Sequence, residues 1–157
     1  MKVKLSDLVD AVESDMDETN QYIDMATGEI LFFTDQEVRA AEDDEPLDDL
    51  PEWEHAAIEA ARKVLEAEEG EFVPAPSKYE FHEYRVMDDF CYRVEDQGVS
   101  NRLLDLIKGR GAFRRFKDEV YRLGIQEDWF SFRDEALKRC VADWCEAKGI
   151  EYTDDMP

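Results

Sequence analysis

The stretch Lys108–Lys117, which reads KGRGAFRRFK, determines how the second half of the chain is expected to fold. Gly109 and Gly111 interrupt a helical pattern, because glycine ends helices and adopts backbone conformations that other residues avoid. Five of these ten residues are basic, whereas the rest of the chain is strongly acidic. The stretch therefore predicts two helices that meet at a short turn, with positive charge concentrated at that turn.

Helices are expected on both sides of the turn. The first covers residues 100–108, with Ser100 as its N-cap. The second covers residues 111–123, because its apolar and its basic residues each recur at helical spacing. The apolar face contains Phe113, Phe116, Val120 and Leu123, and the neighbouring stripe contains Arg110, Arg114, Lys117 and Tyr121.

The regions farther from the turn predict both strands and helices. Two strands near 20–25 and 29–33 flank Gly28, which suits a tight hairpin turn. Phe72–Pro76 suits an edge strand or an extended link, since proline cannot donate to a sheet. Further helices are expected over 6–14, 34–41, 52–68, 79–95 (capped by Ser77) and 127–147, the last lined by Trp129, Phe132, Ala136, Cys140 and Trp144. The predicted fold class is α+β, an N-terminal β-hairpin unit with a predominantly helical remainder.

The length of 157 residues and an apolar content of 43% favour a single domain over residues 1–157. A subdivision is expected around residues 42–49, which are mostly acidic and contain Pro46. Like charges repel and proline blocks helix continuation, so this segment is expected to be a loop. It would join a hairpin-containing part, residues 1–42, to a helical part, residues 51–157.

The net charge of −22 is unevenly distributed along the chain. Residues 1–100 carry 29 acidic and 8 basic side chains, whereas residues 101–157 carry 12 acidic and 11 basic ones. Phosphate-rich partners would be repelled by the first hundred residues. The charge therefore argues against nucleic acid as a partner, although the two helices around Gly109 would also suit a helix-turn-helix.

The location expected from the sequence is the cytoplasm. The first residues lead directly into charged ones, so no secretory signal peptide is recognised. No apolar run approaches the about 20 residues that span a bilayer, so no membrane partner is expected. The chain has 3 cysteines, Cys91, Cys140 and Cys145, and no CxxC motif, a pattern that suggests reduced thiols.

The basic stretch is the candidate functional site. Glycines allow a close backbone approach, free amides at a helix N-terminus attract anions, and arginine adds paired hydrogen bonds to phosphate or carboxylate. The predicted anion site comprises Arg110, Gly111, Ala112, Arg114 and Lys117. The alternative is structural: these cations pair with the excess acid of the first hundred residues and fasten the two parts together.

Three functions remain open, and the first is favoured. It is a non-enzymatic binding or regulatory protein that recognises an anionic group or a protein partner through the basic stretch. The second is an acidic protein that imitates DNA and inhibits a basic protein. The third is a metal-dependent hydrolase that uses Asp88 or Asp89 with Glu83. Because catalytic motifs and cofactor fingerprints are missing, the sequence favours a protein without enzymatic activity, resident metal or cofactor.

The chain is also similar to a bacterial family, uncharacterised protein family zero-one-five-eight. The strongest resemblance is GRGAFRRFKD at residues 109–118, which matches the pattern GxGAFRRFKD. Weaker matches lie at residues 22–24, 27–30, 72–74, 76–77, 87–90 and 129–132, and the likeness extends from residue 3 to about 152. Phe130 stands where members often carry tyrosine. The resemblance implies an α+β fold and supplies no activity, cofactor or catalytic residue.

Overall fold

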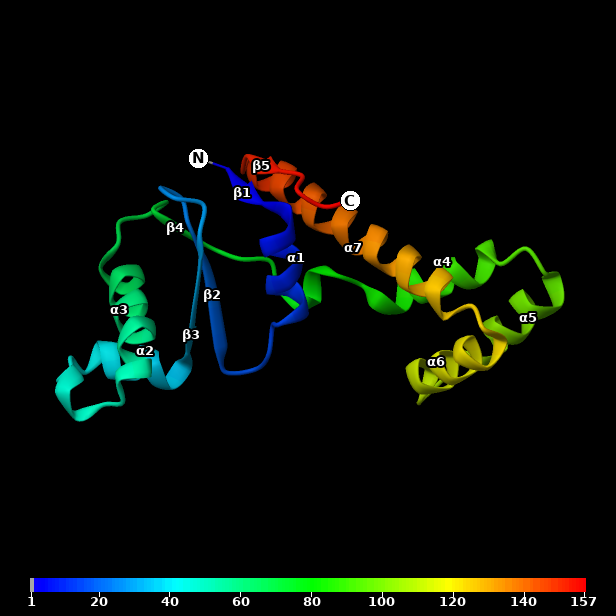
Figure 1. Cartoon of the computed structure of the whole chain (residues 1–157), viewed down its shortest axis with the longest axis horizontal. Coiled ribbons are helices and arrows are strands. Elements are labelled where there is room, and N and C mark those ends of the chain that lie inside the picture. The colour runs from blue at the N-terminus through cyan, green and yellow to red at the C-terminus, as the bar shows by residue number, and fades with distance from the viewer. Residues whose placement is uncertain (1) are drawn as a thin grey trace. The chain divides into compact units, whose positions relative to one another are not determined.

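The computed structural model of the chain describes residues 2–157, with all their side chains except that of residue 49. Within these residues, helices dominate and short strands form two small sheets, so the predicted α+β class is confirmed. The elements in chain order are β1 (Val3–Lys4), α1 (Leu5–Glu13), β2 (Thr19–Asp24), β3 (Ile30–Thr34), α2 (Asp35–Glu42), η1 (Leu47–Asp49), α3 (Glu52–Glu66), β4 (Phe72–Pro74), η2 (Lys78–Glu80), α4 (Glu83–Arg93), α5 (Gln97–Leu106), α6 (Ala112–Leu123), α7 (Gln126–Lys148) and β5 (Tyr152–Thr153) (Figure 1).

The chain divides into two compact units, defined here as unit 1, Met1–Glu80 with Val141–Pro157, and unit 2, Phe81–Cys140. Unit 1 therefore combines the first half of the chain with its last residues, whereas unit 2 is one continuous segment. Helix α7 contributes residues 126–140 to unit 2 and residues 141–148 to unit 1. The acidic segment 42–49 lies inside unit 1.

Unit 1 contains a three-stranded antiparallel sheet in the order β3-β2-β4 (Figure 1). Strands β2 and β3 form the predicted hairpin, with Ile23 opposite Ile30. Gly28 has a φ of 82°, which glycine adopts without steric cost, and its N–H donates to the Asp24 carbonyl over 2.7 Å. The predicted edge strand is also confirmed, because β4 pairs with β2 and places Val73 opposite Ile23.

Helices α2 and α3 supply a hydrophobic core for the hairpin. Thr34 begins α2 with a capping box, in which its hydroxyl accepts from the Glu37 N–H and the Glu37 carboxylate accepts from the Thr34 N–H. The buried core cluster comprises Phe33, Ala40, Ala41, Ile58 and Ala61. An isolated hairpin is marginal in water, so this helix packing explains why the strands persist.

The two ends of the chain meet within unit 1. Strand β1 pairs in parallel with β5, with Val3 opposite Tyr152. The Ser6 N–H donates to one Asp155 carboxylate oxygen over 2.9 Å, and the Ser6 hydroxyl donates to the other over 2.5 Å. These bonds hold the pKa of Asp155 below its usual range. The described chain therefore ends with a short strand, β5, that is held against the N-terminal residues.

Unit 2 is organised around an aromatic core. Trp129 of α7, 2% exposed, packs edge-on against Phe116 of α6 and Phe90 of α4, with ring centroids 4.8 and 5.4 Å away. The buried cluster comprises Met87, Phe90, Cys91, Leu103, Ile107, Ala112, Phe116, Val120 and Trp129. Such rings bury large apolar areas, so this cluster holds α4, α5, α6 and the start of α7 together.

The predicted start of the helix before the basic turn is wrong. Helix α5 begins at Gln97, and its N-cap is Asp96, whose carboxylate accepts from the Val99 N–H over 3.1 Å. Ser100 lies one turn inside the helix, where its buried hydroxyl donates to the Cys91 carbonyl over 2.7 Å. Ser100 therefore ties α5 to α4, because a buried hydroxyl needs a hydrogen-bond partner.

Two smaller expectations also need correction. Ser77 precedes the η2 turn, and α4 starts later, after His82, which makes no side-chain capping bond. In α7 the fully buried positions include Leu137, Val141 and Cys145, whereas Cys140 is only half-buried. Trp129 and Trp144 are buried as predicted, so the prediction for this helix is correct at its two ends and wrong at Cys140.

Candidate functional site

The turn between α5 and α6 is built around Arg115. Its Nε donates to the Leu106 carbonyl over 2.8 Å, one Nη donates to the Lys108 carbonyl over 2.7 Å, and the other donates to the Arg110 carbonyl. The last carbonyls of a helix have no partner within the helix. A guanidinium with its several fixed donors therefore closes α5 and shapes the turn at the same time.

The two glycines of the turn have different surroundings. Both have positive φ, 79° at Gly109 and 74° at Gly111, a conformation that L side chains rarely adopt. A Cβ at Gly109 would meet open space, whereas a Cβ at Gly111 would lie 3.0 Å from an Arg115 guanidinium nitrogen. Gly111 is thus required both by its backbone conformation and by the close approach of Arg115.

The predicted anion site separates into an exposed part and a buried part. The side chains of Arg110, Arg114 and Lys117 are exposed, and none has a hydrogen-bond or ion-pair partner within residues 2–157. Ala112 is 6% exposed and packs in the core of unit 2, so only its backbone could serve a ligand. Gly111 is exposed and is the N-cap of α6, where no side chain caps the helix.

The basic side chains around the turn therefore fall into two groups. Lys108 pairs with Asp105 over 3.2 Å, Arg115 binds backbone carbonyls, and Arg102 and Arg122 both bind Glu119. The remaining three, Arg110, Arg114 and Lys117, pair with no acidic side chain of unit 2. On α6, Arg114, Lys117 and Tyr121 share one face at i, i+3 and i+7. Tyr121 is 74% exposed, so this face carries cations beside an aromatic ring.

Glu119 is the buried carboxylate of this region, at 6% exposed. Arg122 Nε donates to it over 2.6 Å and Arg102 Nε over 3.1 Å. The hydrogen bonds from these two guanidinium groups hold the pKa of Glu119 below the usual value of 4.5, and Arg122 has the larger effect. A carboxylate with a lowered pKa stabilises the folded state above its ordinary pKa, and this contribution is lost as the pH falls through the lowered value.

Glu119→Gln is therefore expected to lower the free energy of unfolding most at neutral pH. The difference from the wild type should shrink as the pH falls below the usual value of 4.5 and through the lowered pKa. Urea unfolding at several pH values measures it, with Asp118→Asn, at the exposed neighbouring position, as the control. A difference between wild type and Glu119→Gln that does not vary with pH would contradict the role given to the two arginines.

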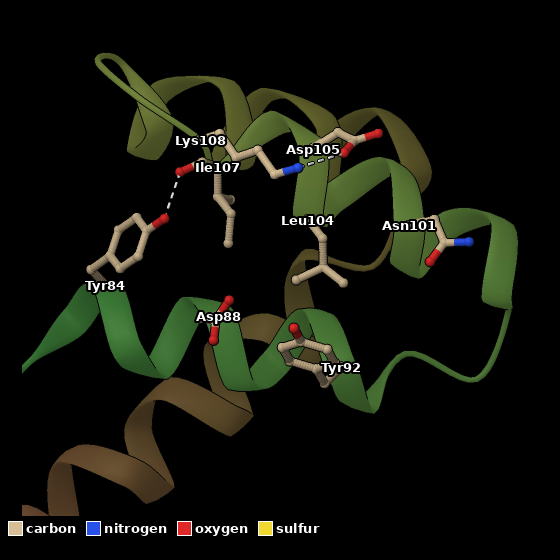
Figure 2. A pocket seen from close by; sticks show the side chains of 8 residues that line it. All are labelled: Tyr84, Asp88, Tyr92, Asn101, Leu104, Asp105, Ile107 and Lys108. Carbon is tan, nitrogen blue, oxygen red and sulfur yellow. Dashed lines mark hydrogen bonds and ion pairs between the residues drawn. The ribbon is translucent and has the colours of Figure 1, made fainter.

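An open cleft lies between α4 and α5, with a volume of about 600 Å³. Figure 2 shows Tyr84, Asp88 and Tyr92 on α4 facing Leu104 of α5 and Ile107 just after it. The Tyr84 hydroxyl donates to the Ile107 carbonyl over 2.8 Å, and its ring meets Phe113 edge-on at 6.3 Å. Tyr84, Asp88 and Tyr92 are spaced by four residues, which is the sequence signal for a shared face of α4.

The carboxylates of the hydrolase hypothesis do not converge on one point. Glu83 accepts from Arg133 Nε over 2.8 Å, Asp88 lines the cleft, and Asp89 is exposed. Among the described side chains, no group of three or more His, Cys, Asp and Glu residues could hold a metal ion. The arrangement that a hydrolase using Asp88 or Asp89 with Glu83 requires is therefore missing.

The buried thiols are unsuited to nucleophilic chemistry. Burial, with the nearby Asp88 carboxylate, raises the pKa of Cys91 to about 12, and burial with Glu146 raises that of Cys145 to about 11. Because their pKa values are raised, both thiols stay protonated at neutral pH, and the thiolate is the reactive form. Of the two histidines, His55 lies 3.1 Å from the Leu50 carbonyl through Nε2, and His82 is exposed.

The two units differ strongly in charge. Unit 1 carries 29 acidic against 7 basic side chains, a net charge of −22, whereas unit 2 carries 12 of each. The basic turn and the cleft both lie in the neutral unit. Among residues 2–157, none of the helices combines the length and the apolar composition needed to cross a membrane.

The fold and the site define a small α+β protein with unpaired cations at a helix start. The chain matches the model of the Uncharacterised protein family (UPF0158) over residues 1–155, and it belongs to this family. The family resemblance carried by GRGAFRRFKD is thus confirmed. The comparisons with curated proteins and with solved structures give no match.

Proposed function

We propose that this protein is a non-enzymatic binding or regulatory protein that recognises an anionic group at the start of α6. The observation that carries the proposal is that Arg110, Arg114 and Lys117 are exposed and lack internal partners within the described residues, while the other cations near the turn are paired. Cations without internal partners are available to a ligand, and exposed guanidinium groups bind phosphate and carboxylate in two-point contacts.

The backbone of the turn supports the same proposal. The first turn of α6 carries no acidic residue, and no side chain caps its N-terminal amides. These amides and the positive end of the helix dipole favour an anion. With a net charge of −22 on the whole chain, long polyanions are repelled at a distance. At physiological salt, exposed charges farther apart than about 8 Å are largely screened from each other. A compact anionic group at the turn therefore escapes most of this repulsion.

Replacing Arg114 with glutamate is expected to weaken anion binding about tenfold or more, since a charge-assisted contact becomes a repulsion. Isothermal titration with pyrophosphate, adenosine triphosphate, polyphosphate and a short oligonucleotide measures the affinity at two salt concentrations. Arg139→Glu is the matched control, because it makes the same charge change at an exposed position of α7 in the same unit. Absence of salt-sensitive binding, or equal losses in both variants, would contradict the proposal.

The confinement of the whole net charge to unit 1 supports a second candidate, the acidic inhibitor that imitates DNA. Its contact surface would lie on unit 1 and its partner would be a basic protein. The two candidates predict opposite results, because Arg114→Glu leaves an inhibitor of this kind active, whereas charge reversal among the carboxylates of unit 1 abolishes its activity.

A further inference from the structure

The cleft between α4 and α5 presents one carboxylate that has no partner. Asp88 is half-buried, and it makes no hydrogen bond or ion pair within residues 2–157. Figure 2 shows its carboxylate directed from α4 into the space in front of Leu104 and Ile107. The same figure shows the Lys108 ammonium turned to Asp105, with which it is paired over 3.2 Å. The basic residue that lines the cleft therefore leaves Asp88 free.

Two tyrosines flank this carboxylate on the same helix. Tyr84 and Tyr92 lie four residues before and after Asp88, so all three side chains project from one side of α4. Tyr84 is fixed, because its hydroxyl donates to the Ile107 carbonyl over 2.8 Å. Tyr92 is 69% exposed and its ring lines the mouth of the cleft. A carboxylate between aromatic rings suits an organic cation, which gains from the charge and from the ring faces together.

We propose that this cleft is a binding site for an organic cation, with the ammonium or guanidinium group on Asp88 and the carbon chain against Tyr92 and Leu104. The volume of about 600 Å³ is large enough for a ligand of this size. The site is separate from the proposed anion site, because Arg110, Arg114 and Lys117 do not line the cleft.

The cation can come from two sources, a free amine or the side chain of a basic peptide. Agmatine serves as the probe for the first source, and an amidated Gly-Arg-Gly-Gly peptide for the second. Isothermal titration of the full chain with each probe at low salt measures the affinity. We expect saturable binding with one site per chain, and the tighter probe identifies the source.

Asp88→Asn is expected to weaken binding of the tighter probe about tenfold or more, because the amide keeps the shape of the carboxylate and removes its charge. Asp89→Asn is the matched control: it changes the same residue type on the same helix, at an exposed position outside the cleft. Both variants have the same net charge, so general attraction of cations falls equally in the two. The control is expected to retain its affinity within about twofold.

The proposal is overturned if neither probe binds saturably or if the two variants lose affinity to the same extent. Thermal unfolding of both variants shows whether Asp88→Asn remains folded. Tyr92→Leu provides a second measurement, since it removes an exposed ring and leaves the carboxylate in place. We expect this variant to lose about threefold or more in affinity, and an unchanged affinity would contradict the arrangement proposed for Tyr92.

Discussion

Trp129→Ala is expected to lower the free energy of unfolding of unit 2 by about 3–5 kcal/mol, the largest stability effect foreseen for the chain. Trp129 is 2% exposed and contacts both Phe116 and Phe90 through its ring. Its removal leaves a cavity at the point where α4, α6 and α7 meet. A surrounding shell of rings cannot collapse fully, so both the transfer free energy and the cavity contribute.

Urea unfolding followed by far-ultraviolet circular dichroism measures this effect, and hydrogen exchange at the amides of α4 and α6 assigns it to unit 2. Phe130→Ala is the matched control, because it truncates the adjacent residue of α7, which is 56% exposed. We expect the control to change stability by no more than about 0.5 kcal/mol. Similar losses for the two variants would mean that the aromatic cluster is not the core of unit 2.

Arg115→Lys is expected to destabilise the chain by about 2 kcal/mol although it conserves the charge. Arg115 reaches the carbonyls of Leu106, Lys108 and Arg110 with separate nitrogens. A lysine ammonium is a single point and cannot span three acceptors that lie on different residues. Water can reach part of this half-buried group, so the loss is smaller than the sum of three charge-assisted bonds.

Arg114→Lys is the control for this substitution, because Arg114 is the adjacent arginine and is exposed without a partner in the described chain. We expect its free energy of unfolding to stay within about 0.5 kcal/mol of the wild type. Equal stability of Arg114→Lys and Arg115→Lys would contradict the structural role of Arg115. The pair thus separates the arginine that shapes the turn from the one available to a ligand.

Much of the fold could be predicted because its signals are local. Gly28 between two β-branched and aromatic runs indicates a hairpin, and Gly109 and Gly111 indicate the break between α5 and α6. The division into units has no such signal. Its second boundary falls inside α7, at residues 140–141, where the helical pattern continues without interruption.

The error at the start of α5 shows why a capping residue is hard to identify from sequence. Asp96 and Ser100 are both good N-cap residues, four positions apart. The choice was decided by a long-range contact, because the Ser100 hydroxyl meets the Cys91 carbonyl of α4. Such a contact depends on how two helices pack, which the spacing of residues within one helix does not contain.

The candidate sites also depend on how helices pack, which the sequence did not reveal. The sequence indicated the basic turn, but it could not distinguish Arg115, which binds three carbonyls, from Arg114, which binds none. Both are arginines in the first turn of α6. The path of the preceding chain determines which of the two side chains can bind the carbonyls of the turn. Asp88 and Asp89 differ in the same way, because their environments depend on the position of α5.

The pairing of β1 with β5 has a consequence for how the chain acquires its structure during translation. Strand β1 is made before its partner, Tyr152–Thr153, and all of unit 2 is made between them. Unit 2, by contrast, consists of consecutive residues, so all of its parts are made before Tyr152–Thr153. Strand β1 therefore stays unpaired along this edge until Tyr152–Thr153 have been made.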